Sequence, residues 1–144
     1  MKSRSDVTIR RTDDIEEVLR LNSLLFRKDE ELNVSGNTYH WLCRDKQTGK
    51  SVGFCSCTDA GYRNLFLSRA GLLRNYRGFN LQKTFILIRE SFARRRGFER
   101  VITYTTYDNY QSIANLIKSG YKLYEPEWKY VGPEFLYYIK HINT

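Results

Sequence analysis

One stretch decides how the fold of this chain is interpreted: Leu72-Leu-Arg-Asn-Tyr-Arg-Gly-Phe-Asn-Leu-Gln-Lys83. It joins an apolar run, residues 65–73, to a segment with helical periodicity that we expect to begin near Asn80. A turn from a strand into a helix presents backbone N–H groups that have no helical partner, together with the positive end of the helix dipole. The stretch is therefore placed to bind a phosphate.

Side chains in the same stretch favour that interpretation. Arg74, Arg77 and Lys83 would give a bound phosphate charge-assisted hydrogen bonds. Gly78 has no Cβ and would allow a ligand to approach the backbone closely. An ordinary basic loop with a turn glycine would have the same composition, so charge alone leaves both interpretations open.

The stretch also resembles the pyrophosphate-binding signature of the GNAT superfamily of N-acetyltransferases, commonly written V-x-P-x-Y-R-G-x-G-x-G. Tyr76, Arg77 and Gly78 match it. The positions that depart from it are Arg74, in place of the proline, and Asn80 and Gln82, in place of two glycines. Asn80 is the milder departure, because asparagine tolerates a positive φ better than other residues with a side chain.

A second segment supports the resemblance. Asn109-Tyr-Gln-Ser-Ile-Ala-Asn-Leu-Ile-Lys-Ser-Gly-Tyr121 is similar to the N-x-x-S/A…GF helix of the same family. The resemblance implies that acetyl-CoA is the acyl donor and that Asn109 binds its pantetheine arm or phosphate region. The residues expected to bind acetyl-CoA are Leu72, Leu73, Arg74, Arg77, Gly78, Phe79, Asn80, Gln82, Lys83 and Asn109.

The resemblance further implies acetyl transfer to a primary amine, which attacks the thioester directly in a ternary complex while strand amides near Leu72 polarise its carbonyl. The tyrosine that protonates the departing thiolate in many members falls at Leu116, which has no proton to give. Tyr107, Tyr110 and Ser112 are the candidates to replace it. We expect His40 to be packed in the core and Glu90 to be solvated, rather than either being a catalytic base.

Periodicity predicts one α/β domain over residues 1–144. The expected fold is GNAT-like: a mixed, mostly antiparallel sheet of six to seven strands, with helices on both faces and strands splayed at the cofactor site. A capping box at Asp13 and Glu16 begins the first helix, and Asp108 is the expected cap of the last. Expected strands lie at 7–11, 39–44, 51–57, 65–73, 100–106, 121–124 and 135–139, with a hairpin turn at Thr48-Gly49, a bulge at Gly71 and helices that include 15–26, 80–96 and 109–120. Residues 27–37 are expected to be a loop or a short second helix.

Composition limits the classes of protein. No apolar run reaches the roughly 18 residues of a membrane helix, and no secretory signal precedes Val7, so we expect a cytoplasmic protein without membrane contact. The cysteines, Cys43, Cys55 and Cys57, are expected to be buried thiols, although a redox or metal pair at 55 and 57 is conceivable, and no metal site is expected. The net charge of +8 favours anionic partners.

Several alternatives remain open at this stage. The amine could be carried on an acidic partner, or be attracted as a cation to Asp29-Glu30-Glu31. Because of Asn80, Gln82 and Leu116, the chain could keep the fold only as a binding or structural protein. Its arginines could instead bind nucleic acid, or act on an amine that nucleic acid carries. Residues 135–139 are expected to be an edge strand, which could pair with a second copy to form a homodimer.

Overall fold

The computed structural model describes residues 4–27, 31–78 and 80–143. Its seven strands form one sheet in the order β1-β2-β3-β4-β5-β7-β6. The strands are β1 (Val7–Thr12), β2 (Thr38–Asp45), β3 (Ser51–Asp59), β4 (Asn64–Leu72), β5 (Arg100–Thr105), β6 (Lys122–Leu123) and β7 (Leu136–His141). The helices are η1 (Arg4–Asp6), α1 (Ile15–Leu25), η2 (Arg74–Tyr76), α2 (Leu81–Arg95) and α3 (Tyr110–Lys118).

The sheet is mixed, as predicted. β4 and β5 run parallel, whereas β1–β2, β2–β3, β5–β7 and β6–β7 are antiparallel. The pairing of β4 with β5 runs from Asn64–Arg100 to Phe66–Ile102, and both strands continue past it, to Leu72 and Thr105. This order of elements confirms the predicted fold class. Residues 27–37 were expected to be a loop or a short second helix. Residues 31–37 contain no helix, and residues 28–30 lie outside the described ranges.

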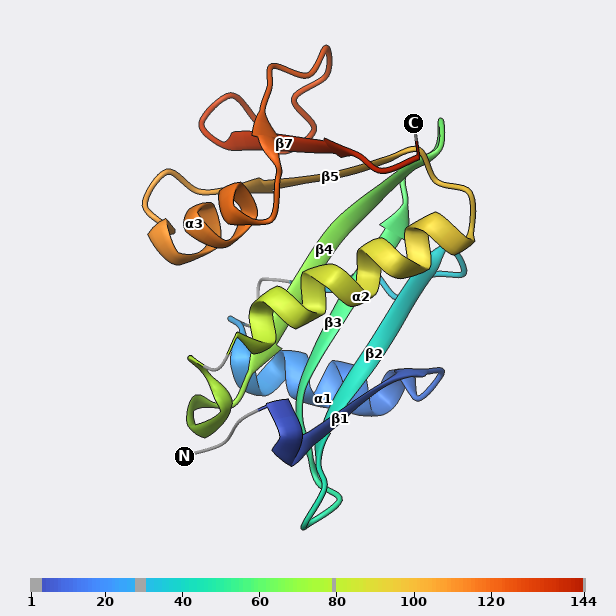
Figure 1. The fold of residues 1–144 in the computed structure, drawn as a ribbon, viewed down its shortest axis with the longest axis vertical. Coiled ribbons are helices and arrows are strands. Elements are labelled where there is room, and N and C mark those ends of the chain that lie inside the picture. The colour runs from blue at the N-terminus through green and yellow to red at the C-terminus, as the bar shows by residue number, and fades with distance from the viewer. Residues whose placement is uncertain (1–3, 28–30, 79, 144) are drawn as a thin grey trace. The chain divides into compact units, whose positions relative to one another are not determined.

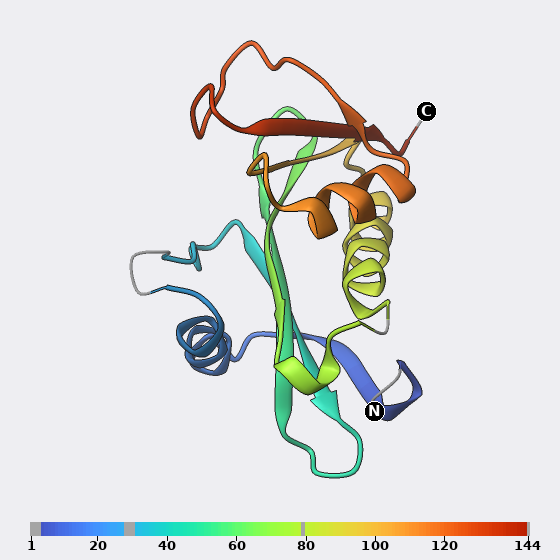
Figure 2. The same ribbon diagram turned by 90° about the vertical axis from the view of Figure 1, so that its left-hand side faces the viewer.

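The chain divides into two compact units, of which the first comprises Met1–Thr58 and Ser68–Phe85. In this unit α1 lies to one side of β2 and β3 (Figure 2). Val18 and Leu21 of α1 pack into a core cluster with Leu42 and Phe54 of these strands. Leu21 is fully buried in this cluster, whereas Leu19 of the same helix is 37% exposed.

The ends of α1 also differ from the prediction in detail. The N-cap is Asp14, whose carboxylate accepts the Glu17 amide hydrogen at 3.2 Å, so the capping pair lies one residue later than Asp13 and Glu16. At the other end, a Cβ on Gly71 would lie 2.9 Å from the Phe26 ring. A requirement for close packing therefore accounts for Gly71 within β4.

The second unit comprises Asp59–Leu67 and Ile86–Thr144. Gly97, with φ of +81°, follows α2, whose last turn carries Arg94 and Arg95. The expectation that Glu90 is solvated was wrong, because Glu90 is 1% exposed. Its carboxylate accepts hydrogen bonds from the Tyr121 hydroxyl at 2.8 Å and the Lys140 ammonium at 3.0 Å. Burial and the adjacent Glu90 carboxylate raise the pKa of Tyr121, so its hydroxyl remains a donor.

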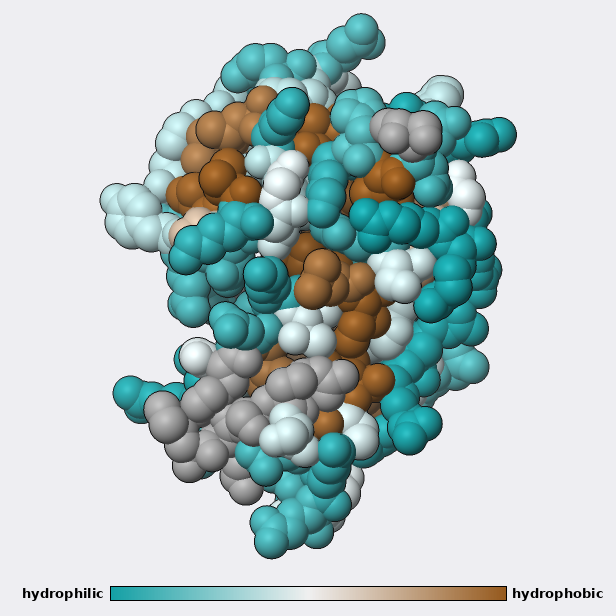
Figure 3. Space-filling model, in the orientation of Figure 1, coloured by the Kyte–Doolittle hydropathy of each residue, from teal (hydrophilic) through white to brown (hydrophobic). Residues whose placement is uncertain are grey.

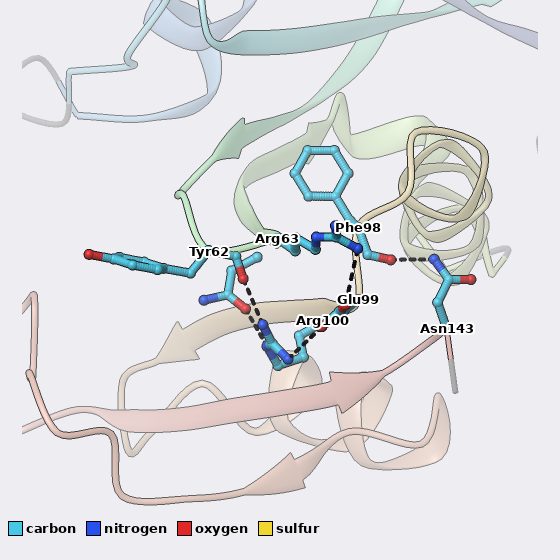
Figure 4. Close-up of polar contacts among 7 residues, drawn as sticks. Tyr62, Arg63, Phe98, Glu99, Arg100 and Asn143 are labelled. Carbon is cyan, nitrogen blue, oxygen red and sulfur yellow. Dashed lines mark hydrogen bonds and ion pairs between the residues drawn. The ribbon is translucent and has the colours of Figure 1, made fainter.

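The turn between β3 and β4 holds two residues in the left-handed region, Tyr62 at φ 55° and Arg63 at φ 63°. Arg100 fixes this turn (Figure 4). Its guanidinium donates to the Tyr62 carbonyl and to the Asn64 side chain, both at 2.6 Å, and Arg63 pairs with Glu99 at 3.2 Å. Such conformations are unfavourable for residues with a Cβ, and the surrounding bonds maintain them.

The C-terminal strand is not an edge strand, contrary to the prediction for residues 135–139. β7 lies beside β5 (Figure 1) and is covered on its other side by β6, which pairs Lys122 with Ile139 and Leu123 with Tyr138. The edge was misassigned because β6 is so short that the sequence gives little sign that it covers β7. Pairing of an exposed β7 edge with a second copy of the chain is therefore no longer a reason to expect a homodimer.

Candidate cofactor site

The predicted phosphate loop follows β4 directly and lies within the first unit. Leu72 is buried, and the Leu73 amide donates to the Val52 carbonyl at 2.8 Å. The chain then turns through η2, where the Tyr76 amide donates to the Leu73 carbonyl at 2.9 Å. Because its amide hydrogen is already bonded within the sheet, Leu73 has no free backbone donor with which to polarise a thioester carbonyl.

Arg77 braces the loop from within. Its Nε donates to the Leu72 carbonyl at 2.9 Å, which ties the loop to the end of β4. The residue is nonetheless exposed, as are Arg74 and Lys83. The structure therefore places Arg74 and Arg77 in the loop and Lys83 in the first turn of α2, and it gives Arg77 a structural contact as well.

Two residues of the loop adopt a positive φ, Gly78 at 87° and Asn80 at 60°. A Cβ on Gly78 would have no protein atom within 4 Å, so backbone conformation rather than crowding by the protein requires a glycine there. Asn80 adopts the conformation that made it the milder departure from the signature. Its carbonyl accepts the Thr84 amide hydrogen at 2.9 Å, which starts the hydrogen bonding of α2.

Tyr76 fixes the other side of the loop. Its hydroxyl donates to Asp45 Oδ2 at 2.5 Å, and this hydrogen bond raises the pKa of Tyr76 to about 12. Asp45 Oδ1 accepts amide hydrogens from Gln47 at 2.8 Å and Thr48 at 3.2 Å, which shape the hairpin turn. One buried carboxylate thus holds both the β2–β3 hairpin and the phosphate loop.

The remaining predicted site residues lie in the second unit, around α3. The N-cap of α3 is Asn109 rather than Asp108, and the Asn109 side-chain carbonyl accepts the Ser112 amide hydrogen at 3.3 Å. This contact uses the side-chain carbonyl oxygen of Asn109 and not its NH₂ group. Leu116 is buried. Phe79 lies outside the described residues.

The candidate proton donors occupy the start of α3 and the turn before it. Tyr107 and Tyr110 are 58% and 76% exposed, and Ser112 is partly buried. The surface in the view of Figure 3 includes hydrophobic patches among its polar residues. Ile117 of α3 is 48% exposed. The structure therefore leaves these hydroxyls accessible, and it leaves their individual roles as predictions.

Other predicted features concern the sheet. His40 is buried, with Nδ1 2.6 Å from Ser56 Oγ and Nε2 3.0 Å from Thr38 Oγ1, so the packed interpretation is confirmed. Burial lowers the pKa of His40. All three cysteines are buried, and none of them forms a disulfide within the described part of the chain. Within residues 4–27, 31–78 and 80–143, no three His, Cys, Asp or Glu side chains gather as metal ligands, and no helix has the length and apolar character to cross a membrane.

Sequence reasoning missed the contacts that hold the loop. Nothing in the sequence pairs Tyr76 with Asp45, because the two residues are far apart in the chain and meet only through the register of β2, β3 and β4. The turn propensity around Thr48-Gly49 marks the hairpin, but it gives no sign that the hairpin contacts residues near 76.

Comparison with known proteins finds similarity in structure but not in sequence. No family model matches the chain, and no curated protein matches its sequence. Among solved structures, an acetyltransferase of the GNAT family from Staphylococcus aureus matches with a TM-score of 0.74 at 11% identity, over 95% of this chain and 99% of that one. The chain has the GNAT fold.

Two further solved structures are similar to this chain in fold. The ribosomal-protein-S18-alanine N-acetyltransferase from Escherichia coli has a TM-score of 0.74 at 13% identity, covering 96% of this chain and 95% of that one. A Bacillus anthracis protein in complex with acetyl coenzyme A has a TM-score of 0.65 at 14% identity, covering 80% and 71%. At such identities the GNAT fold is shared while the sequences have diverged widely.

Proposed function

We propose that this protein is an N-acetyltransferase that transfers an acetyl group from acetyl-CoA to a primary amine. The observation that carries the proposal is the loop between β4 and α2. On a GNAT fold, it combines the matching Tyr76-Arg77-Gly78 with left-handed backbone at Gly78 and Asn80. These are the backbone conformations that the glycine-rich signature requires.

The residues of the loop suit a pyrophosphate. The first-turn amides of α2 have no helical acceptor, and the helix dipole places partial positive charge beside them. Arg74 and Lys83 are exposed and can supply counter-charge, while Arg77 keeps terminal NH₂ groups beyond the Nε that braces the loop. The Bacillus anthracis neighbour holds acetyl coenzyme A on the same fold, which supports this choice of acyl donor.

Bound acetyl-CoA would supply an activated thioester, so the chain has to orient an amine and transfer a proton to the departing thiolate. Positioning two reactants in one complex can supply a large part of the rate enhancement. We propose Asn109 as a ligand of the cofactor through its side-chain NH₂ group, and Tyr107, Tyr110 or Ser112 as the group that returns a proton to the departing thiolate. Leu116 cannot do so, because it is apolar and buried.

The acceptor class is the less specific part of the proposal. The Escherichia coli neighbour is an alanine N-acetyltransferase for a ribosomal protein, and the net charge of +8 suits an amine on an acidic protein or on nucleic acid. An acceptor-attracting role for the run at 29–31 rests largely on residues outside the described ranges. The alternative is a GNAT-fold protein that binds acetyl-CoA without turnover, which the departures at Gln82 and Leu116 favour.

Calorimetric titration with acetyl-CoA tests the cofactor half of the proposal. We expect saturable 1:1 binding, weakened about tenfold or more in Arg77→Gln because charge-assisted contacts to phosphate are lost. Arg10→Gln is the matched control, since Arg10 is an exposed arginine on β1 of the same unit. Absence of binding by the wild-type protein would overturn the proposal, and equal affinity in Arg77→Gln would refute the phosphate assignment.

Release of free CoA across a panel of amines, acidic peptides and amine-bearing nucleic acids tests the catalytic half. With an acceptor in hand, the three single variants Tyr107→Phe, Tyr110→Phe and Ser112→Ala are compared. Loss of the true general acid should lower kcat by about 10²-fold or more while leaving acetyl-CoA affinity unchanged. Binding without turnover on any acceptor would favour the non-catalytic alternative.

A further inference from the structure

A second polar site lies in the first unit, between α1 and the β2–β3 hairpin. A pocket of about 790 Å³ opens there, and Leu73 and Tyr76 of the phosphate loop form part of its wall. Three cations line it: Arg20 of α1, Arg44 of β2 and Lys50 at the end of the hairpin turn. Glu17 is the single carboxylate in the wall.

The acidic group is already compensated. Glu17 Oε1 lies 2.5 Å from Arg20 Nε, and this hydrogen bond lowers the pKa of Glu17. In the described parts of the chain, neither the Arg44 guanidinium nor the Lys50 ammonium makes a hydrogen bond or salt bridge. Arg44 also stabilises the Glu17 carboxylate electrostatically. With three cations and one carboxylate in its wall, the pocket therefore retains a net charge of two positive units.

We propose that this pocket binds a phosphoryl group. A phosphate monoester carries about −1.5 to −2 charges at pH 7, which matches the net positive charge of the pocket wall better than a carboxylate does. The guanidinium of Arg44 can bind two phosphate oxygens at once, and Thr48 and Ser51 bring hydroxyl groups to the same wall. The pocket is open and about 790 Å³ in volume, so it has room for a phosphoryl group that belongs to a larger molecule.

Two sources of this phosphoryl group fit the pocket. One is the 3′-phosphate of CoA, since Leu73 and Tyr76 belong to both the pocket wall and the proposed pyrophosphate loop. The other is a separate phosphorylated molecule, for which the hydrogen bond between Tyr76 and Asp45 would connect pocket and loop. The first source rests on the proposed function, and the second does not.

The test follows the backbone amide signals of the isotopically labelled full chain by NMR during titration with inorganic pyrophosphate. We expect shifts at residues 48–51, on the pocket wall. The double variant Arg44→Gln/Lys50→Gln should weaken these shifts about tenfold or more in apparent affinity, and higher ionic strength should weaken them further. Lys46→Gln is the matched control, because Lys46 is exposed in the same turn but lies outside the pocket wall.

Hairpin shifts that disappear in the double variant and persist in Lys46→Gln support the pocket. Absence of hairpin shifts, or equal affinity in a double variant whose spectrum shows it to be folded, overturns it. Titration with CoA and dephospho-CoA distinguishes the sources. If dephospho-CoA binds the wild type more weakly than CoA does, by the same factor as CoA binding is weakened in the double variant, the ligand group is the 3′-phosphate. If CoA and dephospho-CoA bind with equal affinity while pyrophosphate still shifts the hairpin signals, the pocket binds a separate ligand. Hairpin shifts in a protein that binds no CoA would refute the proposed function alone.

Discussion

The hydrogen bond from Tyr76 to Asp45 predicts a stability effect with its own pH signature. Tyr76→Phe removes only the hydroxyl that donates to Asp45 Oδ2 at 2.5 Å, and it keeps the ring that lines the pocket. We expect the variant to fold and to be less stable than the wild type, because a charge-assisted hydrogen bond to a buried carboxylate is lost.

The size of the loss can be bounded from the structure. The hydrogen bond raises the pKa of Tyr76 from its ordinary 10 to about 12, and a change of that size in a fully buried group would correspond to about 2.7 kcal/mol. The Tyr76 side chain is partly exposed, so solvent screening reduces the contribution. We therefore expect the free energy of unfolding to fall by about 1 kcal/mol.

Urea denaturation of both proteins at a series of pH values measures the difference. Because the pKa is raised in the folded state, the contribution of the hydroxyl is fully present below about pH 10, the ordinary value for tyrosine. It should disappear as the pH rises through about 12. Tyr62→Phe is the control, since the Tyr62 side chain is 91% exposed, and its effect should stay within about 0.5 kcal/mol.

A loss in Tyr76→Phe no larger than that in Tyr62→Phe would refute the contact. A loss that persists unchanged to pH 12 would show that the hydroxyl acts through packing rather than through its hydrogen bond to the carboxylate. Comparing the two proteins at each pH cancels the titration of all other groups.

Three further perturbations give distinct outcomes. Lys140→Met should lower the free energy of unfolding by about 3 kcal/mol, because Glu90 stays buried without its ammonium partner. The control Lys122→Met, at an exposed position, should change it by less than about 0.5 kcal/mol. Equal effects of the two variants in denaturant melts would contradict the burial of Glu90. Gly53→Ala should lower the melting temperature by several degrees, since its Cβ would lie 2.7 Å from a backbone oxygen of β4; an unchanged melting temperature would mean that the strands can separate there. Burial lowers the pKa of His40, so part of the free energy of unfolding should be lost as the pH falls below about 6.5. The loss between about pH 7 and 5 should be smaller in His40→Asn than in the wild type. Parallel curves of unfolding free energy against pH would exclude His40 as the cause.

Local patterns were sufficient to predict most of the fold. Alternation marks β1, β-branched and aromatic residues mark β5, and Gly97 marks the end of α2, because these signals depend on neighbours in sequence. The failures have a common origin in tertiary contacts. Glu90 was expected in solvent. Arg94, one helical turn later, lies 3.9 Å from its carboxylate, but its hydrogen-bond partners Tyr121 and Lys140 come from distant segments.

The candidate site shows the same division. The loop was located from the sequence, and the positive φ of Asn80 followed from asparagine's tolerance of left-handed backbone. The brace from Arg77 to the Leu72 carbonyl and the link from Tyr76 to Asp45 could not be predicted, because they depend on where β2, β3 and β4 place their ends. The same holds for the cations of the hairpin pocket, Arg44 and Lys50.

The burial of Glu90 has a consequence for how the second unit opens. Lys140 on β7 donates both to Glu90 on α2 and, at 2.7 Å, to the Ser119 carbonyl at the end of α3. Releasing β7 would thus strand a carboxylate inside the protein and free the end of α3 in the same event. In hydrogen exchange, the amides of β7 and of the last turn of α3 should therefore report one shared opening, with a common free energy and a common response to denaturant, rather than independent fraying from the C-terminus.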